Sequence, residues 1–223
     1  MLKAAIFDLD GTLLDSGEGI TESLRYAERK LGLTPVPEEG LLRYVGMPIR
    51  PMLGMMYGVT GENADARIDT ILEAYREHYR AIGHKKVTIF EGVPEMLEQL
   101  KKAGIKIAIA TSKREQFSRA NLTDMGLIQY FDALAFAKPD DSSINKVGIV
   151  KEAVDMLDLP PSECIMVGDK EFDIEGARGA GTQALGVTYG FGSTEEIESA
   201  KPDYIAQTAE KAGEIILKLK INN

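Results

Sequence analysis

Two pairs of aspartates have the types and spacing to do chemistry. Asp8 and Asp10 directly follow the apolar run AIF, and Gly11 comes next. Residues two apart at the end of an extended segment point to the same side. Carboxylates that close repel each other, and one of them holds a proton unless a cation neutralises the pair. The pair therefore predicts either a site for cation and proton chemistry or a loop in which Asp10 caps a turn.

A second acidic pair lies in the segment GDKEFD. Asp169 follows the apolar run CIMV, and Asp173 comes four residues later, on the same side if a helical turn begins there. Acidic residues in the first turn of a helix are also ordinary caps. If both runs are strands of one parallel sheet, four carboxylates meet at one edge of that sheet. Such a set of oxygen ligands suits a hard divalent cation, and Mg²⁺ is the cofactor that we predict.

Groups that could hold a phosphate follow other apolar runs. Thr111 and Ser112 come after IKIAIA, and we expect them at a helix N-terminus, where hydroxyls and backbone amides bind anions. Ordinary helix capping by these two residues is the alternative. A lysine is also needed for a phosphate site. Lys138 in AKPD and Lys146 in INKVGIV are the two candidates.

The order of apolar runs and helical patterns predicts the elements that position these residues. We expect strands at 4–7, 105–110, 132–136, 164–167 and 184–187, and helices that include 94–103 and 146–157. Strands that alternate with helices are typical of an α/β protein with a doubly wound, Rossmann-like parallel sheet. Such sheets bind ligands at the carboxyl ends of their strands, which is where both acidic pairs lie.

The segment from Ser16 to about Lys86 breaks this alternation. It contains apolar stripes at helical spacing and four prolines, but no convincing strand. We therefore predict an all-helical cap domain at 16–86, inserted into an α/β core formed by 1–15 and 87–223.

Composition limits the classes of partner. The chain has 223 residues and a net charge of −9, which argues against nucleic acid or an anionic membrane, because both need a basic footprint. Cys164 is the only cysteine, which fits a reducing compartment. We find no signal peptide and no run near the roughly 18 apolar residues of a membrane span. The expectation is a soluble, cytoplasmic protein without nucleic-acid or membrane partners, either a monomer or a homodimer.

The motifs occur in an order that resembles a known group of enzymes. DLDGTLLDS, then TSK, then a lysine, then GDKEFD is similar to the haloacid dehalogenase superfamily. The helical insertion resembles that of its phosphoglycolate-phosphatase-like branch, and the likeness covers essentially the whole chain, including VGMPIRPML and GVTYGFGS. The resemblance implies a Mg²⁺-dependent phosphatase that hydrolyses a small phosphorylated metabolite through an aspartyl-phosphate intermediate.

The resemblance also implies a role for each motif residue. Asp8 would be the nucleophile, and Asp10 would protonate the leaving oxygen and then deprotonate the attacking water. The implied phosphate-binding residues are Asp8, Gly11, Thr111, Ser112 and Lys146. Mg²⁺ would be held by the Asp8 carboxylate, the Asp10 backbone carbonyl, Asp169 and Asp173.

The choice of lysine follows from spacing. In relatives this lysine stands just before the helix that leads to the GD strand, and Lys146 lies 23 residues before Asp169, close to the family separation. Lys138 lies 31 residues before it, although its KP dipeptide matches the family in letters. Lys146 is therefore our prediction, with Lys138 as the alternative.

The same residues also suggest other classes of protein. A phosphoacceptor receiver module uses similar groups, but its acceptor aspartate follows a later strand and its chain carries no insertion. A 5'-nucleotidase, a pyrophosphatase and a phosphomutase could all use this core. Substrate choice would lie in the cap, where Arg50, Gly46 and also Arg43 are candidate substrate contacts. Solvated surface arginines are the alternative for both arginines.

Overall fold

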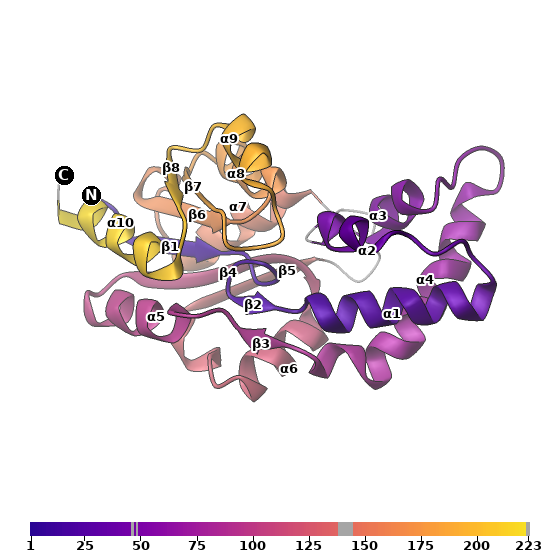
Figure 1. Cartoon of the computed structure of the whole chain (residues 1–223). Coiled ribbons are helices and arrows are strands. Elements are labelled where there is room, and N and C mark those ends of the chain that lie inside the picture. Colours follow the sequence, from indigo (N-terminus) through magenta and orange to yellow (C-terminus); the bar gives the residue numbers. More distant parts are fainter. Residues whose placement is uncertain (46, 48, 138–144, 222–223) are drawn as a thin grey trace. The chain divides into compact units, whose positions relative to one another are not determined.

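The computed structural model describes residues 1–45, 47, 49–137 and 145–221. The chain divides into two compact units (Figure 1). The first, called the core unit below, comprises Met1–Asp15 and Ile89–Asn223, and the second, called the helical unit, comprises Ser16–Thr88.

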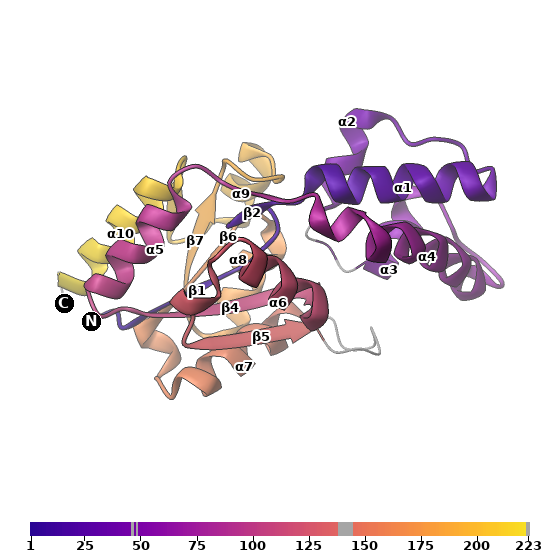
Figure 2. The same cartoon turned by 90° about the horizontal axis from the view of Figure 1, so that it is seen from below.

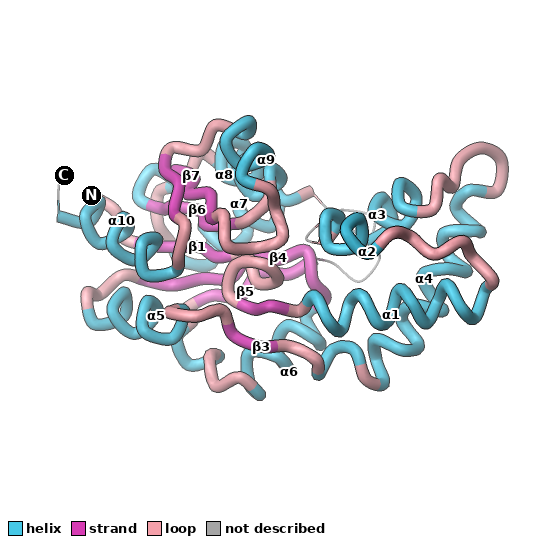
Figure 3. The backbone as a smooth tube through the Cα atoms, viewed as in Figure 1, coloured by secondary structure: helices cyan, strands magenta, loops and turns pink. Residues whose placement is uncertain are grey.

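The core unit is built on one parallel sheet of six strands (Figure 3). The strands lie in the order β5-β4-β1-β6-β7-β8, and each neighbouring pair is parallel. Their bounds are β1 Ala4–Phe7, β4 Lys106–Arg114, β5 Ala133–Ala137, β6 Cys164–Gly168, β7 Gln183–Val187 and β8 Tyr204–Ala206. The predicted α/β class is confirmed, and among these six strands only β8 was not predicted.

The helices of the core unit cover both faces of the sheet (Figure 2). They are α5 Val93–Lys102, α6 Glu115–Asp124, α7 Lys146–Leu157, α8 Glu171–Ala180, α9 Thr194–Ala200 and α10 Ala209–Ile221, with 3-10 turns at Ile128–Tyr130 and Pro161–Glu163. From β1 the chain steps to β4 and β5, and it then returns across β1 to β6. Because such crossovers are right-handed, this reversal places α7 and α8 on the opposite face from α5. In agreement, α5 packs on α10, whereas α7 packs on α8.

β1 lies at the centre of this arrangement. Its residues are completely buried, and it pairs with β4 on one side and β6 on the other. A strand covered on both faces needs an uninterrupted apolar run, which is what AAIF supplies. Burying one side chain of the size of Ile6 or Phe7 contributes about 1.5–3 kcal/mol. The strand order also reverses at β1, so its carboxyl end is the switch point where such sheets bind ligands.

The helical unit consists of α1 Gly17–Leu31, α2 Glu38–Leu41, α3 Ile49–Met56 and α4 Ala64–Ala81, with 3-10 turns at Leu42–Tyr44 and Gly83–Lys85. α1 packs on α4, and each presents the apolar stripe that its sequence predicts, with Leu24 and Leu72 among the buried residues. The chain leaves the core unit through β2 Leu14–Asp15 and returns through β3 Thr88–Ile89, and these two strands form a second sheet.

Candidate active site

β1 and β6 bring the two acidic pairs to the same edge of the sheet. The Asp8 backbone N–H donates to the carbonyl of Val167 at 2.9 Å, which continues the pairing of the two strands to the first acidic residue. Asp169 follows one residue after β6. Parallel strands in register end at the same edge, so residues 161 positions apart in the sequence meet there.

Three carboxylates form a buried cluster at this edge. Asp8, Asp169 and Asp173 each offer an oxygen within 4.8 Å of the others. Lys146, the first residue of α7, places its Nζ 2.8 Å from Asp8 Oδ1 and 2.7 Å from Asp173 Oδ1. Within the cluster this ammonium pairs with Asp8 and Asp173, so the three carboxylates carry more negative charge than it neutralises. The remaining negative charge and the hard oxygen donors fit a divalent cation such as Mg²⁺.

The electrostatics of the cluster reflect this excess of negative charge. Burial and the neighbouring Asp173 raise the pKa of Asp8 to about 6, even though Lys146 opposes the shift. Burial, Asp173 and Asp8 raise the pKa of Asp169 to about 8. Burial disfavours the charged form of Lys146, but its ion pairs with Asp173 and Asp8 outweigh this and raise its pKa. The protein alone thus does not fully stabilise these carboxylates in their charged form.

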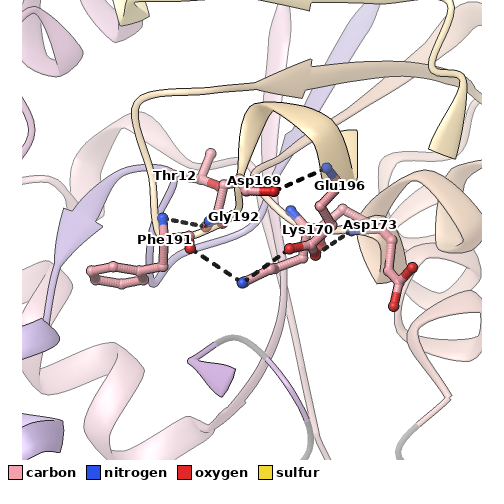
Figure 4. A network of polar contacts seen from close by, with 9 residues as sticks. Thr12, Asp169, Lys170, Asp173, Phe191, Gly192 and Glu196 are labelled. Carbon is pink, nitrogen blue, oxygen red and sulfur yellow. Dashed lines mark hydrogen bonds and ion pairs between the residues drawn. The ribbon is translucent and has the colours of Figure 1, made fainter. Parts of the chain in front are cut away.

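Asp169 is fixed by neighbours that the sequence analysis did not identify (Figure 4). Its Oδ2 accepts hydrogen bonds from the backbone N–H groups of Phe191 at 2.9 Å and Gly192 at 3.3 Å. The Thr12 hydroxyl donates to Oδ1 at 3.1 Å. The ammonium of the buried Lys170 donates to the Phe191 carbonyl at 3.3 Å and so ties down the same loop. Phe191 and Gly192 belong to the segment GVTYGFGS, which the sequence singled out only as part of the family resemblance and not as a set of partners for Asp169.

Asp173 combines the two roles that its sequence position allowed. Its Oδ2 accepts a hydrogen bond from the Lys170 backbone N–H at 3.0 Å, which caps the start of α8 (Figure 4). Its Oδ1 faces Lys146 in the cluster. Helix capping and membership of the carboxylate cluster are therefore compatible, because a carboxylate has two oxygens.

Gly11 allows the backbone to pass close to the cluster. Its φ is +90°, a conformation that glycine adopts without strain. A Cβ at this position would lie 2.3 Å from Asp169 Oδ2. A side chain at residue 11 would thus displace the carboxylate of Asp169, which accounts for the glycine after the first acidic pair.

The expectation that Thr111 and Ser112 lie at a helix N-terminus is wrong. β4 continues through both residues to Arg114, and α6 begins only at Glu115. The strand continues because Thr111 still pairs with β5, after which a bulge shifts the register before Arg114. Thr111 is nevertheless buried in the carboxyl half of β4. Because β4 runs parallel to β1, Thr111 lies near the same edge of the sheet as the acidic residues.

A second lysine reaches the site from β4. Lys113 Nζ lies 2.8 Å from Asp10 Oδ1. Lys113 was not among the predicted site residues, although it lies two residues after the candidate Thr111 and residues two apart in a strand point to the same side. The side chain of Asp10 thus engages Lys113, while Asp8 and Asp173 share Lys146, and Asp169 accepts hydrogen bonds from Thr12 and from backbone amides.

The remaining predicted residues are not part of the carboxylate cluster that the structure describes. Lys138 and Gly46 lie outside the described residues, as does the side chain of Arg43. Arg50 lies on α3 in the helical unit, where its guanidinium pairs with Asp69 and, at 3.5 Å, with Asp65. Both carboxylates belong to α4, so these pairs tie the two helices together.

Comparison with known families decides the class of protein. Residues 5–187 match the family described as haloacid dehalogenase-like hydrolase. The chain belongs to this family. The predicted resemblance is therefore confirmed, and the residues of the carboxylate cluster all lie within the matched range.

Individual relatives carry several names. The chain is 37% identical over 208 residues to tyrosine-protein kinase PtkA of Mycobacterium tuberculosis, covering 93% of this chain and 69% of the relative. It is 36% identical over 208 residues to a phosphoglycolate phosphatase of Agrobacterium fabrum, covering 90% and 86%. A solved structure, a predicted phosphatase from Clostridium acetobutylicum, matches with a TM-score of 0.91 at 32% identity and covers 98% of this chain and 99% of that chain.

This family member carries no membrane-spanning helix within the part of the chain that the structure describes. Cys164 is buried in β6, and burial raises the pKa of its thiol to about 11. The thiol is therefore protonated at neutral pH and contributes packing to the core.

Proposed function

We propose that this haloacid dehalogenase-like phosphatase hydrolyses a small phosphomonoester through a phosphorylated Asp8. The observation that carries the proposal is the position of Asp8: a buried carboxylate at the switch point of the sheet, 2.8 Å from the Lys146 ammonium and grouped with Asp169 and Asp173. A carboxylate is a competent nucleophile toward phosphorus when the repulsion between the two anions is neutralised.

The proposed reaction has two steps. In the first, an Asp8 oxygen attacks phosphorus, the bond from phosphorus to the leaving oxygen breaks, and Asp10 gives that oxygen a proton. In the second, water attacks the phosphorylated Asp8, Asp10 takes a proton from the water, and inorganic phosphate leaves. Lys146 and the Thr111 and Ser112 hydroxyls would hold the phosphoryl oxygens, and the backbone at Gly11 would lie beside them.

Mg²⁺ is the cofactor that we propose for this site. The Asp8 carboxylate, the Asp10 backbone carbonyl, Asp169 and Asp173 would hold it. Three of these ligands already form the buried cluster, and the raised pKa values of Asp8 and Asp169 support a site that needs added positive charge. A bound divalent cation neutralises charge on the phosphoryl group and on the attacking carboxylate.

The substrate class follows from the relatives and from the sequence. The likeness to the phosphoglycolate phosphatase from A. fabrum supports a small phosphorylated acid as the substrate of this chain. A nucleotidase, a pyrophosphatase and a phosphomutase are the alternative activities. We further propose that residues 16–86 act as a cap that selects the substrate, and that the enzyme works in the cytoplasm.

The likeness to PtkA favours a second reaction, in which a tyrosine hydroxyl rather than water accepts the phosphoryl group. The same nucleophile and the same proton carrier would serve this reaction. The two reactions differ in product, because only hydrolysis releases inorganic phosphate from a simple phosphomonoester at a steady rate.

The test measures phosphate release from a panel of phosphomonoesters with Mg²⁺, together with acid-quenched trapping of the phosphorylated protein. We expect steady release, and a trapped phosphate that neutral hydroxylamine removes, as it does from acyl phosphates. Asp8→Asn should lose both the turnover and the trapped phosphate. Steady turnover by Asp8→Asn would contradict the proposed function.

A further inference from the structure

The ion pair between Lys113 and Asp10 lies beside the carboxylate cluster, and the reaction sequence above gives Lys113 no part. The two side chains are only 7% and 13% exposed. Removing charged groups from water is costly, and the cost is recovered only where the geometry is good and further hydrogen bonds are made. A surface ion pair needs no special explanation, but a buried pair beside the carboxylate cluster indicates a role in the site.

The local backbone directs Lys113 toward the site. Within the irregular stretch of β4 between Thr111 and Arg114, the Lys113 backbone N–H donates to Thr111 Oγ1 at 3.2 Å. β4 is the direct neighbour of β1, so a side chain at the end of β4 reaches across to the residues that follow β1. The short segment TSK thus brings a hydroxyl and an ammonium to the same edge of the sheet, the first for phosphate and the second for Asp10.

We propose that Lys113 is a positioning residue that holds the Asp10 carboxyl group in the orientation needed for proton transfer. The contact engages Oδ1, at 2.8 Å, and it thereby fixes the direction of the other oxygen. That second oxygen, Oδ2, gives its proton to the leaving oxygen in the first step and takes a proton from water in the second. This inference rests on the proposed function, in which Asp10 carries the proton.

Leaving groups separate positioning from other roles. An alkyl phosphate expels a strongly basic alkoxide and needs a proton from Asp10, whereas 4-nitrophenyl phosphate expels a stable phenolate and barely needs one. General acids typically contribute about 10²–10⁴-fold to such steps. A lysine that orients Asp10 should therefore matter for the alkyl ester and hardly for the aryl ester. A lysine that binds the phosphoryl group should matter for both.

The experiment measures release of the leaving group in the first turnover with Mg²⁺, for glycerol phosphate and for 4-nitrophenyl phosphate. We expect Lys113→Met to slow the alkyl ester on the order of 10–100-fold and the aryl ester less than about 3-fold. Lys113→Arg should restore most of the lost rate, because a guanidinium can also hold a carboxylate oxygen. The KM for both esters should stay within about 3-fold, since Lys113 is not proposed to bind them.

A double-mutant comparison supplies a second readout. If Lys113 acts only through Asp10, the variant Asp10→Asn/Lys113→Met should be no slower on glycerol phosphate than Asp10→Asn alone. The double variant also removes both charges together, so it leaves no unpaired buried charge if Lys113→Met alone folds poorly. Lys101→Met is the matched control, because it removes another lysine–aspartate pair of the core unit, with Asp132 at 2.9 Å, away from the carboxylate cluster.

Two results would overturn the proposal in an active enzyme: equal losses on the two esters, or losses from Asp10→Asn and Lys113→Met that multiply in the double variant. Absence of phosphate release by the unmodified protein from every ester would instead overturn the proposed function, and this inference with it.

Discussion

In the core unit the side chains of Lys146 and Asp8 are 8% and 6% exposed, whereas in the helical unit Arg50 pairs with Asp69, whose side chain is 62% exposed. At the carboxylate cluster the core unit buries several charges together, at a cost in desolvation that good geometry must offset. The helical unit leaves most of its charges in water, where an ion pair contributes about 0–1 kcal/mol.

This difference separates the residues that we propose for catalysis from residues that connect neighbouring segments. Exposed pairs such as Lys86 with Glu22, or Arg50 with Asp69, connect neighbouring segments of the helical unit. Asp8 and Asp169 of the core unit lie where two strands end, and their raised pKa values indicate that folding alone does not stabilise their charged forms. A group that the fold leaves unsatisfied in its charged form is a candidate for function.

The largest expected effect concerns the centre of the cluster. Asp8→Asn should lower kcat/KM for every phosphomonoester by on the order of 10⁴-fold or more, because an amide is a poor nucleophile. Catalytic groups that work together lose most of their effect when one of them is removed. The fold should persist, as circular dichroism would show. The matched variant Asp69→Asn in the helical unit should keep nearly full activity, and a comparable loss there would break the comparison between the two units.

Removal of the shared ammonium should have the next largest effect. Lys146→Ala should cost about 2–4 kcal/mol of transition-state stabilisation on both phosphoglycolate and an aryl phosphate, since both present the same phosphoryl group. Measuring kcat/KM for Lys146→Ala and Lys138→Ala tests this. If Lys138→Ala is the variant that fails on both esters, the argument from spacing is wrong.

The pH dependence of metal binding should sharpen the comparison further. The pKa of Asp8 is about 6 and that of Asp169 about 8 in the folded protein, both above the ordinary value of 3.8. Between the ordinary pKa of 3.8 and the raised values, the folded state binds more protons than the unfolded state. The metal-free protein should therefore become more stable as the pH falls from about 8 toward about 4. Protons and Mg²⁺ compete for the same oxygens, so the gain in stability from Mg²⁺ should be large above about pH 8 and lost as the pH falls through about 6.

Thermal unfolding with Mg²⁺ and with a chelator, at about pH 5.5 and about pH 8.5, measures this effect. A ligand at a hundred times its Kd adds about 2.7 kcal/mol of stability, which sets the scale of the expected shift. An equal gain in Tm at both pH values would contradict the assignment of the metal to these carboxylates.

The smallest expected effect lies in the helical unit. Arg50→Ala should change kcat/KM by less than about 3-fold on phosphoglycolate and on an aryl phosphate, and stability by about 0–1 kcal/mol, because the guanidinium already pairs with Asp69 and Asp65. A selective loss on phosphoglycolate would show instead that Arg50 contacts the second anionic group, as the sequence suggested.

Much of the fold could be predicted from local pattern. The buried strand AAIF, the helix at 146–157 and the two apolar stripes of the helical unit follow from periodicity, which depends only on which faces are covered. β8 was missed because YIA is a short edge strand whose first two residues are only partly buried. The start of α6 was misplaced because pairing between β4 and β5, which is not local, carries the strand four residues further.

The sequence by itself determined the chemical inventory of the site: the acidic residues after β1 and β6, the glycine that turns the chain, and a lysine at the start of α7. Only the tertiary structure decided how these charges are shared. It gave Lys146 to Asp8 and Asp173, Lys113 to Asp10, and the amides of Phe191 and Gly192 to Asp169. Spacing along the chain limits which residues share an element, but ion pairs form across elements, and strand order sets which elements are neighbours.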